Sequence, residues 1–446
     1  MHSGPSGLPA VVVVGAGAAG IGAGLALARS RVPYIILEAS SRLGGRAYTD
    51  CDSLGSLFDH GCHWFHSADR NPLRVLADRL GHAYAGRTVR GVRPLCIDGQ
   101  WLDQAERESI NSMIFGMFDE IEAAASQGRD VAASDLIDFS GRFGPLRRHW
   151  MELLECRAPE EISVLDAGRY FDTRVNFAVK DGYGRLFEKL SHGLAIRFTS
   201  PVSGIESRKD GVRVSGSFGE IDCAAVILTA PLAVLAAGAI TLRPAPDQAF
   251  TTALDDVRMG TYEKAVVAFD RPILTLPPGT PISYCDIVDP GDPDDLPLNF
   301  EIHPFGRPLA IGHLAGGSLD GLLATEGRRG FADLAIAKLV RAFGGDIRRH
   351  IVGTLVTSWG SNPYIRGGYA IARPGRAKSR DTLIAGDISD RVFLAGEACH
   401  PYWFATAHGA YLTGIDRAHR ALAAIGQPAA PPDPLWLPPV EAAAGG

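Results

Sequence analysis

At 446 residues the chain is too long for one ordinary hydrophobic core, and its length predicts two or three domains. A hydrophobic fraction of 46% with 21% charged residues is typical of globular proteins and argues against extensive disorder. Forty-four Lys and Arg stand against 50 Asp and Glu, a formal charge of −6 without a basic block, so nucleic acid is not an expected partner.

The seven cysteines are scattered, odd in number and form no C-x-x-C pair, which favours reduced thiols in a cytoplasm over a disulfide framework or a zinc site. The leader MHSGPSGLPA lacks Lys and Arg and does not have the pattern of a signal peptide, and no apolar run reaches the about 18 residues of a membrane span. Residues 429–446 are dense in Pro and Ala and are expected to form a flexible tail. We expect a cytoplasmic protein, a monomer or homodimer, that contacts no membrane.

Residues 11–38 have the pattern of a dinucleotide-binding turn. Four valines predict a short buried strand, the Ala- and Leu-rich segment after Gly20 predicts a helix, and Tyr34–Leu37 predicts a second strand. The G-x-G-x-x-G between strand and helix allows close approach of the backbone to a pyrophosphate, and an acid at the end of the second strand can bind ribose hydroxyls. The expected cofactor contacts here are Gly15, Gly17, Ala18, Gly20, Glu38 and Ala39. A glycine-rich turn without a ligand is the alternative.

The segment after Glu38 reads A-S-S-R-L-G-G-R and ends at Arg46. An acid followed by R-x-G-G-R after such a turn resembles the flavin-dependent amine oxidase superfamily, which binds FAD rather than NAD. The resemblance implies that Arg46 reaches the pyrophosphate or the flavin, and that Gly44 and Gly45 permit close approach of the backbone. A surface loop with two arginines is the alternative.

Residues 59–66 are similar to the D-x-G-x-x-W-x-H segment of polyamine oxidases. The resemblance places this segment, Gly61 included, beside the flavin and His66 in the substrate channel, where a neutral imidazole can accept a hydrogen bond from the amine. A structural histidine is the alternative for His66, and His60 and His63 are expected to be structural. No acidic or Cys partner stands at a ligand spacing from them, so no metal is expected.

Between residues 73 and 170, three segments have helical apolar spacing without strand alternation between them. They are residues 71–81, 106–126 and 143–158. We interpret this region as an inserted helical part of a substrate domain.

Strand patterns return after residue 184. A helix is predicted at 185–194, with strands at 196–207, 211–216 and 225–230, the last ended by Pro231. This succession resembles the returning half of an FAD domain, in which the backbone of Val202 pairs with the adenine.

Residues 236–387 predict a second part of the substrate domain, with strands at 262–270, 311–316 and 351–359 and a helix at 331–344. Lys264 is unexpected on an otherwise apolar alternating strand. In the amine oxidases a lysine at the matching place holds a water next to flavin N5, and the resemblance implies this role for Lys264. A snorkelling lysine on an edge strand is the alternative.

The acidic loop at 286–295 is expected to be a solvated turn, with attraction of cations to a channel mouth as the alternative.

Residues 358–375 contain W-G-S-N-P-Y-x-R-G-x-Y, which closely resembles the spermine and acetylpolyamine oxidase branch and, more loosely, the lysine-specific histone demethylases. Monoamine oxidases attach FAD through a cysteine just before the matching tyrosine. Here that residue is Gly368, so the resemblance implies non-covalent FAD. Tyr369 would form one aromatic wall in front of the flavin.

The last motif, at 391–422, predicts a strand, then A-G-E, then a helix that begins near His408. The resemblance places Gly396 and Glu397 near the ribityl chain of FAD. It places the backbone amides of Thr406 and Ala407 near the flavin pyrimidine, at the positive end of the helix.

Monoamine oxidases and some plant polyamine oxidases carry a second tyrosine where this chain has Thr406. Tyr402, Trp403 or Phe404 could supply the missing wall. The expected substrate contacts are His66, Tyr369, Trp403 and Thr406.

The motifs predict an α/β fold with two discontinuous domains. A Rossmann-type FAD-binding domain is expected from residues 1–72, 178–235 and 388–428. An α+β substrate domain, a mixed sheet with the helical insertion, is expected from residues 73–177 and 236–387.

The resemblance implies an FAD-dependent amine oxidase acting on a small-molecule amine, with a polyamine-type substrate favoured. A hydride passes from the amine alpha carbon to flavin N5, water hydrolyses the imine to aldehyde and amine, and O2 reoxidises the flavin to give H2O2. The expected catalytic residues are Lys264, His66 and Tyr369.

Three alternatives remain open from the sequence. One is an L-amino-acid oxidase, in which Arg366 or Arg373 would bind the substrate carboxylate. Another is a specialised amine or amide oxidase of secondary metabolism or alkaloid breakdown. The third is a flavin-free binding protein on the same fold, similar to the prenyl-GTPase chaperones.

Overall fold

A six-stranded sheet forms one half of the protein, in a computed structural model that describes residues 9–86, 92–277, 283–292 and 294–431. In spatial order its strands are β22 (Asp387–Ser389), β23 (Val392–Leu394), β13 (Ala225–Leu228), β1 (Val11–Val14), β2 (Tyr34–Leu37) and β9 (Ile196–Arg197). Neighbours are parallel except β22, which pairs antiparallel with β23. Every residue of β1 and β13 is buried, which explains their continuous apolar sequences. Residues 1–8 of the leader and 432–446 of the predicted tail lie outside the described residues.

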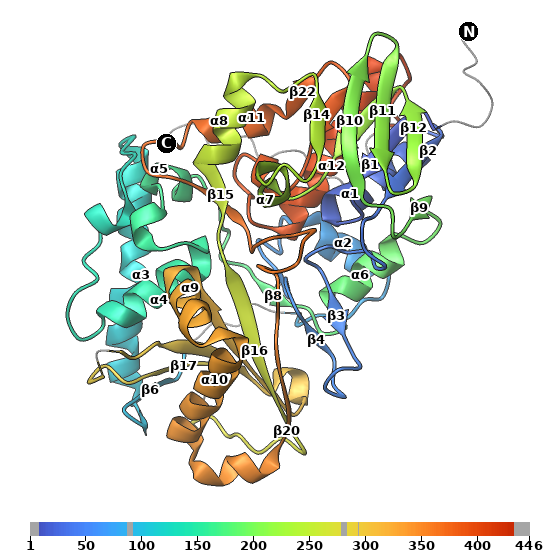
Figure 1. Ribbon diagram of the computed structural model, residues 1–446. Coiled ribbons are helices and arrows are strands. Elements are labelled where there is room, and N and C mark those ends of the chain that lie inside the picture. Colours follow the sequence, from blue (N-terminus) through green and yellow to red (C-terminus); the bar gives the residue numbers. More distant parts are fainter. Residues whose placement is uncertain (1–8, 87–91, 278–282, 293, 432–446) are drawn as a thin grey trace.

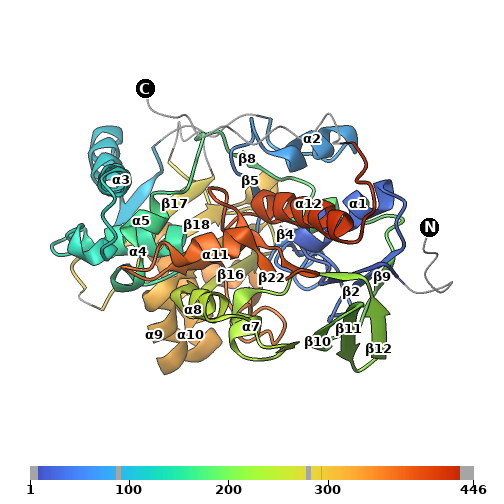
Figure 2. The same ribbon diagram turned by 90° about the horizontal axis from the view of Figure 1, so that it is seen from above.

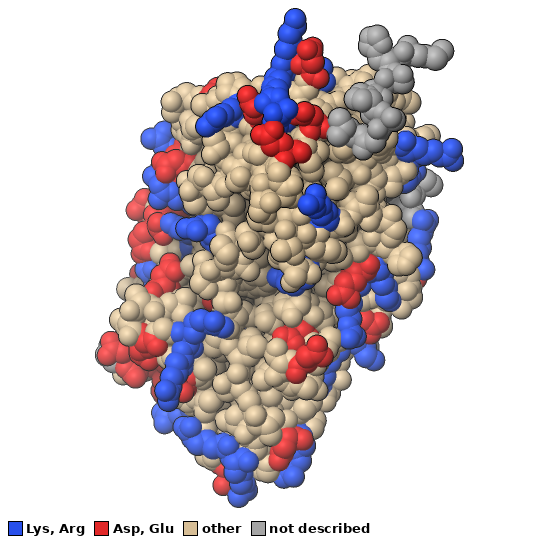
Figure 3. Space-filling view, turned by 45° about the vertical axis from the view of Figure 1, so that its right-hand side comes forward, with Lys and Arg blue, Asp and Glu red and all other residues tan. Residues whose placement is uncertain are grey.

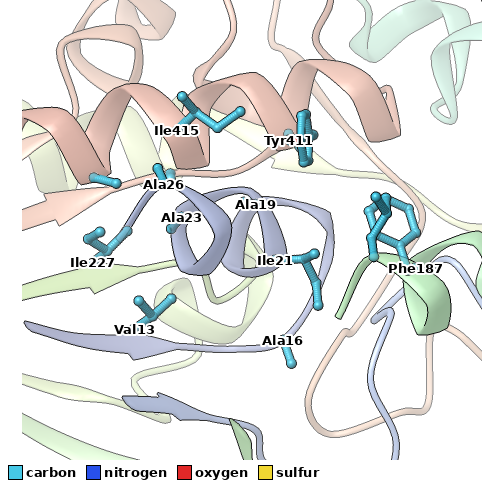
Figure 4. Close-up of a cluster of buried hydrophobic side chains, with 14 of the residues drawn as sticks. Val13, Ala16, Ala19, Ile21, Ala23, Ala26, Phe187, Ile227, Tyr411 and Ile415 are labelled. Carbon is cyan, nitrogen blue, oxygen red and sulfur yellow. The ribbon is translucent and has the colours of Figure 1, made fainter. Parts of the chain in front are cut away.

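Helices α1 (Ala18–Arg29) and α12 (Ala407–Ala424) pack against each other over this sheet. Two glycines allow the close approach. A Cβ at Gly22 would lie 2.3 Å from the carbonyl oxygen of Tyr411, and one at Gly414 would lie 1.9 Å from that of Ala19. Figure 4 shows the small side chains of α1 between the sheet and α12. The two ends of the chain therefore build one layer beside the glycine turn.

A four-stranded sheet follows at the edge of the molecule (Figure 1). Its strands are, in order, β12 (Gly219–Cys223), β11 (Gly211–Gly216), β10 (Val202–Arg208) and β14 (Thr241–Arg243). The single strand predicted at 196–207 is wrong, because the chain turns at Thr199, with φ of 53°, and divides into β9 and β10 in different sheets. β13 ends at Leu228, earlier than predicted, and Pro231 precedes the short helix α7 (Leu232–Ala236).

The second half of the protein is a seven-stranded sheet. Its strands are, in order, β20 (Ile351–Val356), β16 (Tyr262–Phe269), β19 (Leu309–Ala315), β18 (Leu298–Ile302), β17 (Tyr284–Val288), β6 (Leu95–Ile97) and β7 (Gln100–Trp101). All neighbours are antiparallel except β17 and β6. In Figure 1, α10 (Gly327–Phe343) lies along β16 and β20.

The prediction of a purely helical insertion is partly wrong. The three predicted helices are present as α2 (Pro72–Arg79), α3 (Gln104–Ser126) and α4 (Gly144–Glu155). The hairpin β6–β7 also lies in this region and extends the large sheet. β6 is a three-residue, fully buried run, so it carries no alternation from which a strand could be predicted.

The remaining elements pack around the two large sheets. They are α5 (Val164–Ala167), α6 (Tyr183–Leu190), α8 (Gln248–Asp256), α9 (Gly316–Thr325), α11 (Ser379–Ala385), and the strand pairs β3 (Thr49–Asp50) with β4 (Phe58–Asp59), β5 (Trp64–Phe65) with β8 (Phe177–Ala178), and β15 (Val257–Met259) with β21 (Ala370–Ala372). Figures 1 and 2 place α3 at one end of the molecule and β10–β12 at the other. The predicted domain ranges stay a prediction, and the limit at residue 235 separates β14 from the sheet that it joins.

No helix among the described residues is long and apolar enough to cross a bilayer. On the face in Figure 3, Lys and Arg lie among Asp and Glu. In the acidic loop, Asp289 and Asp295 bind the buried ammonium of Lys338, so this part of the loop is ion-paired and not a simple solvated turn.

Candidate active site

The glycine turn brings the predicted acid back onto the backbone of the first strand. Gly15 has a φ of 102°, a conformation that favours glycine. The carboxylate of Glu38 is buried and accepts hydrogen bonds from the amide of Ala16, at 2.7 Å, and from the amide of Ser40, at 2.8 Å. The acid is therefore held at the turn by backbone amides and by the hydroxyl of Ser40, which donates to it at 2.7 Å.

The residues after the turn fit a pyrophosphate. A Cβ at Gly20 would lie 1.8 Å from the carbonyl oxygen of Gly15, so the helix can pack on the turn only with glycine there. Around Gly17, by contrast, nothing lies within 4 Å of the Cβ position. Gly17 is the N-cap of α1, has no side-chain cap, and Ala18 opens the helix without an acidic residue in its first turn. The amides at this helix end are thus open to an anionic ligand.

Two further cofactor candidates lie next to Glu38. Ala39 follows it and is half-buried. The amide of Ser200 donates to the carbonyl oxygen of Glu38 at 2.8 Å, and Val202 begins β10 two residues later. The predicted adenine contact and the predicted ribose acid are therefore neighbours in space.

Arg46 and Glu397, predicted from motifs far apart in the sequence, contact each other. The Arg46 Nη1 atom lies 3.2 Å from Glu397 Oε1 and also donates to the carbonyl oxygen of Gly368. The second oxygen of Glu397 accepts from the amide of Ala405 at 3.0 Å. Arg46, Gly368 and Glu397 belong to three different motifs that were predicted to bind the flavin, and these contacts bring the three motifs together.

Tight backbone packing surrounds this point. A Cβ at Gly61 would lie 1.8 Å from the carbonyl oxygen of Arg46. A Cβ at Gly368 would lie 2.4 Å from the Sγ atom of Cys156, so a cysteine side chain has no room at the position through which monoamine oxidases attach FAD. The amide of Gly396 donates to Thr413 Oγ1 at 3.0 Å, which fixes the A-G-E segment onto α12.

Lys264 lies inside the seven-stranded sheet, on β16 between β19 and β20, and its residue is 2% exposed. The alternative of an edge lysine is therefore wrong. Its Nζ atom donates to the carbonyl oxygens of Asp59, at 2.8 Å, and Gly61, at 2.7 Å, and lies 3.1 Å from His63 Nδ1. Burial lowers the pKa of Lys264, opposed by the carboxylates of Asp59 and Glu301.

His66 is exposed and can accept a hydrogen bond. Its Nδ1 lies 3.1 Å from Asn176 Oδ1, which also accepts from the amide of Ser67 at 3.2 Å. Because that oxygen is an acceptor, Nδ1 carries the hydrogen and Nε2 keeps a free lone pair. The surrounding protein lowers the pKa of His66, opposed by Asp172, which favours the neutral ring.

Tyr369 is half-buried and its hydroxyl donates to the carbonyl oxygen of Leu153. Its ring centre lies 6.1 Å from that of Tyr262. Burial raises the pKa of Tyr369, with Tyr170 and Glu155 among the further causes. The hydroxyl is engaged by the backbone, so the ring face is the part of Tyr369 available to a ligand.

Trp403 and Phe404, two candidates for a second aromatic wall opposite Tyr369, have different surroundings. Trp403 is buried, stacks on His400 at 5.2 Å, and its indole nitrogen has no hydrogen-bond partner within the described part of the chain. Phe404 packs edge-on against Tyr170 at 5.7 Å and so connects to the surroundings of Tyr369.

Thr406 is the N-cap of α12. Its hydroxyl accepts from the amide of Gly409 at 3.0 Å and donates to the carbonyl oxygen of Trp403 at 2.7 Å. The hydroxyl is therefore committed to the helix end, where Ala407 follows at the first helical position. A contact of Thr406 with the flavin through its backbone amide stays a prediction.

Glu155 is a candidate that the sequence interpretation did not include. It is the last residue of α4, half-buried, and its carboxylate makes no hydrogen bond or ion pair with any described residue. Burial raises its pKa to about 7, with Asp166 as a further cause and Arg380 opposing. It contributes to the raised pKa of both Tyr369 and Tyr170, and the carbonyl oxygen of Leu153, two residues before it on α4, accepts from the Tyr369 hydroxyl. Its position follows from packing of α4 and has no motif that could have indicated it.

His63, predicted to be structural, is the side chain that contacts Lys264. Glu301 and His313 offer ligand atoms that lie, with an atom of His63, within 4.8 Å of one another. Glu301 and His313 lie on β18 and β19, so no spacing within residues 60–66 could have indicated them. Both nitrogens of His63 already have hydrogen-bond partners, Lys264 at Nδ1 and Tyr284 at Nε2, so the cluster is organised by hydrogen bonds.

Residues 104–422 match the family described as flavin containing amine oxidoreductase, which is well over half of the chain. The chain belongs to this family. Residues 13–80 also match an NAD(P)-binding Rossmann-like domain. FAD is thus the expected cofactor of this amine oxidoreductase, and the open turn at Gly17 fits its dinucleotide part. The predictions of the family, of the Rossmann-type fold and of an enzyme are confirmed.

The relatives of this chain include proteins named as histone demethylases and proteins named as polyamine oxidases. Lysine-specific histone demethylase 2 of Homo sapiens is 24% identical over 444 residues, which cover 93% of this chain and 53% of that protein. Polyamine oxidase 2 of Arabidopsis thaliana is 26% identical over 436 residues, covering 91% and 86%. A redesigned putrescine oxidase has the same fold, with a TM-score of 0.74 at 17% identity over 93% of this chain and 99% of that chain. The chain spans about half the length of the human demethylase and of its counterpart in Mus musculus.

Proposed function

We propose that this amine oxidoreductase oxidises a C–N bond in a small amine that carries a second cationic group, with a polyamine-type substrate favoured. The carboxylate of Glu155 is the observation that carries the proposal, because it has no partner among the described residues and ends the helix whose Leu153 carbonyl binds the Tyr369 hydroxyl. A carboxylate that no protein group occupies can pair with an ammonium group of a ligand through a charge-assisted hydrogen bond. Relatives named polyamine oxidases support the same substrate class.

Three side chains act on the reacting amine in this proposal. Bound FAD supplies the hydride acceptor. His66 accepts a hydrogen bond from the neutral amine at Nε2, and the ring of Tyr369 orients the alpha carbon and excludes water. Lys264 holds a water beside the flavin. To donate to this water, its Nζ atom gives up the hydrogen bond to His63, which is longer than its bonds to the carbonyl oxygens of Asp59 and Gly61. Water then converts the imine to aldehyde and amine, and O2 is the proposed electron acceptor, giving H2O2.

An amino-acid oxidase finds less support in the geometry. Arg373 binds Asp256 at 2.7 Å and Asp255 at 3.2 Å, so its guanidinium is already paired. Arg366 is exposed at the surface, and its backbone has a φ of 63°. Neither offers a free guanidinium inside the site for a substrate carboxylate.

Anaerobic bleaching of the flavin tests the substrate class. The oxidised flavin absorbance should disappear fastest with diamines and polyamines, more slowly with monoamines, and not with amino acids. Fast bleaching by an amino acid, or only by an alkaloid-type or secondary-metabolite amine, would replace the proposal with one of the alternatives.

The FAD should be released by acid. Because Gly368 provides no thiol and a side chain there would meet Cys156, we expect precipitation with trichloroacetic acid to leave a colourless pellet and free FAD in the supernatant. The absorbance spectrum and a mass measurement of the supernatant check this result. Yellow colour that stays in the pellet would contradict non-covalent binding.

Glu155→Gln should weaken the binding of diamines selectively. Loss of a charge-assisted contact worth at least about 1.4 kcal/mol raises KM at least about tenfold. A monoamine of the same chain length, which leaves the second position empty, should change less than about twofold. Since burial raises the pKa of Glu155 to about 7, the carboxylate forms as the pH rises through that value. The KM ratio of monoamine to diamine should therefore increase with pH in the natural protein and stay flat in the variant.

Glu152→Gln is the matched control. It lies on the same helix, and burial raises its pKa to about 7 as well, but its carboxylate accepts from the amide of Ser318 at 3.1 Å. We expect the diamine KM of this variant to stay unchanged. Equal effects of the two variants, or equal effects of Glu155→Gln on diamine and monoamine, would contradict the assignment of Glu155.

A further inference from the structure

Arg380 on α11 is fully buried and reaches three segments of the candidate site with one side chain. Its Nη1 atom donates to the carbonyl oxygen of Ala398 at 3.1 Å, and its Nη2 atom donates to that of Ala370 at 3.0 Å. Its Cζ atom lies 4.1 Å from the ring centre of Phe404. Asp166 on α5 is also fully buried, accepts from Nε at 2.7 Å and from Nη2 at 2.6 Å, and so holds the guanidinium in one orientation.

The three contacted segments carry residues that were predicted to bind the cofactor or the substrate. Ala370 directly follows Tyr369, whose ring is the proposed wall in front of the flavin. Ala398 directly follows Glu397, the predicted contact to the ribityl chain. Phe404 is itself a candidate for the second wall. One guanidinium therefore connects the substrate side of the candidate site with the cofactor side.

The same ion pair holds the strand that follows Tyr369. This strand, β21, has three residues, and the sheet that it forms with β15 has only these two strands. The amide of Ala372 donates to Asp166 Oδ2 at 2.8 Å, and the carbonyl oxygen of Ala370 accepts from Arg380. Both charged side chains thus bond to the backbone of β21, which leaves this short strand little freedom to shift.

Stability alone does not account for the pair. A buried ion pair stabilises a fold little more than apolar side chains of similar volume, because both charges lose their hydration. An apolar pair cannot supply direction, however. The guanidinium is planar and its N–H groups point in fixed directions, so the carbonyl oxygens that it binds are held at a fixed separation. A lysine would supply the charge without this rigid set of donors.

We propose that Arg380 is a positioning residue for the oxidation, which fixes the ring of Tyr369 relative to the carboxylate of Glu397. Arg380 contacts neither the amine nor FAD in this role and acts through the backbone of Ala370 and Ala398. A shift of about 1 Å between groups that hold two reactants can lower a rate about a hundredfold. The inference rests on the proposed function, in which Tyr369 orients the amine, and on the predicted contact of Glu397 with the cofactor.

The double variant Asp166→Leu with Arg380→Met separates position from stability. It removes both charges, so much of the stability that a broken pair would lose should be kept, but it has no donors for the two carbonyl oxygens. The affinity for FAD, measured by titrating the apoprotein and following flavin fluorescence, should fall at least about tenfold. At saturating FAD, with the amine that bleaches the natural protein fastest, the limiting rate of flavin reduction should also fall at least about tenfold.

Arg380→Lys is the second variant, because it keeps a positive charge opposite Asp166 but not the rigid set of donors. We expect both measurements to fall in this variant as well. Lys338→Met is the matched control. Lys338 is a buried cation at 3% exposed, and it pairs with Asp289 and Asp295 on the far side of the large sheet. Its replacement should leave FAD affinity and the limiting rate unchanged.

A merely structural role of Arg380 predicts that both measurements follow the free energy of unfolding. The double variant would then bind and reduce FAD like the natural protein, and Lys338→Met would lose as much as Arg380→Lys at equal loss of stability. Either result would overturn the inference. Since FAD binding requires no amine, that measurement decides the role of Arg380 even if the substrate panel identifies another class of substrate.

Discussion

Lys264→Met is expected to slow flavin reduction, or flavin reoxidation, at least about tenfold, equal to about 1.4 kcal/mol of activation free energy. Methionine has nearly the length of lysine but cannot donate to the carbonyl oxygens of Asp59 and Gly61. The variant thus loses the buried positive charge next to the segment that the family places beside the flavin. Stopped-flow absorbance of the flavin, with amine under anaerobic conditions and then with O2, measures each half-reaction separately.

Lys338→Met is the matched control for this experiment. Lys338 is also buried, at 3% exposed, but it pairs with Asp289 and Asp295 on the far side of the large sheet. Its replacement should destabilise the fold and leave both half-reactions unchanged. If Lys264→Met retained FAD and both of its rates, Lys264 would have no part in the mechanism.

Asp166→Ala is expected to lower the free energy of unfolding by about 3–5 kcal/mol, which is the loss found when one partner of a buried ion pair is removed. Asp166 and Arg380 are both fully buried and are joined by two hydrogen bonds, of 2.7 and 2.6 Å. Arg380 also donates to the carbonyl oxygens of Ala370 and Ala398. The pair therefore ties α5 and α11 to the strand after Tyr369 and to the segment that carries Glu397. Urea unfolding of the FAD-loaded variant measures the effect.

Two comparisons separate the buried charge from lost packing. The double variant Asp166→Leu with Arg380→Met removes both charges and should recover much of the loss, because replacing a whole buried pair costs less than breaking it. Asp222→Ala breaks the exposed pair with Arg213 and should have a far smaller effect. A loss in Asp166→Ala no larger than in Asp222→Ala would contradict the prediction.

Local sequence patterns predicted most elements of the fold. The turn between β1 and α1, the long strand β16 and the helix α12 lie where their patterns indicated, because each is built mainly from neighbouring residues. The hairpin β6–β7 and the break at Thr199 were not predicted. The hairpin has a local signal in its Asp98-Gly99 turn, at φ of 51° and 79°, but its strands are too short to show an alternating pattern. The break at Thr199 exists because β9 pairs with the distant strand β2, which no local period reveals.

Some residues of the candidate site could be predicted from sequence motifs and others could not. Arg46 and Glu397 could be predicted from separate motifs, and the structure shows that they contact each other. Glu155 and His63 had no such motif. Their chemistry depends on what surrounds them: a carboxylate left without a partner in one case, and an ammonium 201 residues away in the other.

The sequence by itself determined the family, the dinucleotide turn and the absence of a thiol at Gly368, because these depend on residue types at fixed short spacings. Only the tertiary structure decided that Lys264 is an interior residue of the sheet and that hydrogen bonds connect it through His63 to Tyr284. The physical reason is that burial and pairing of a charged group are set by strands that come together from distant parts of the chain. The protonation of such a group follows from that assembly and not from its neighbours in sequence.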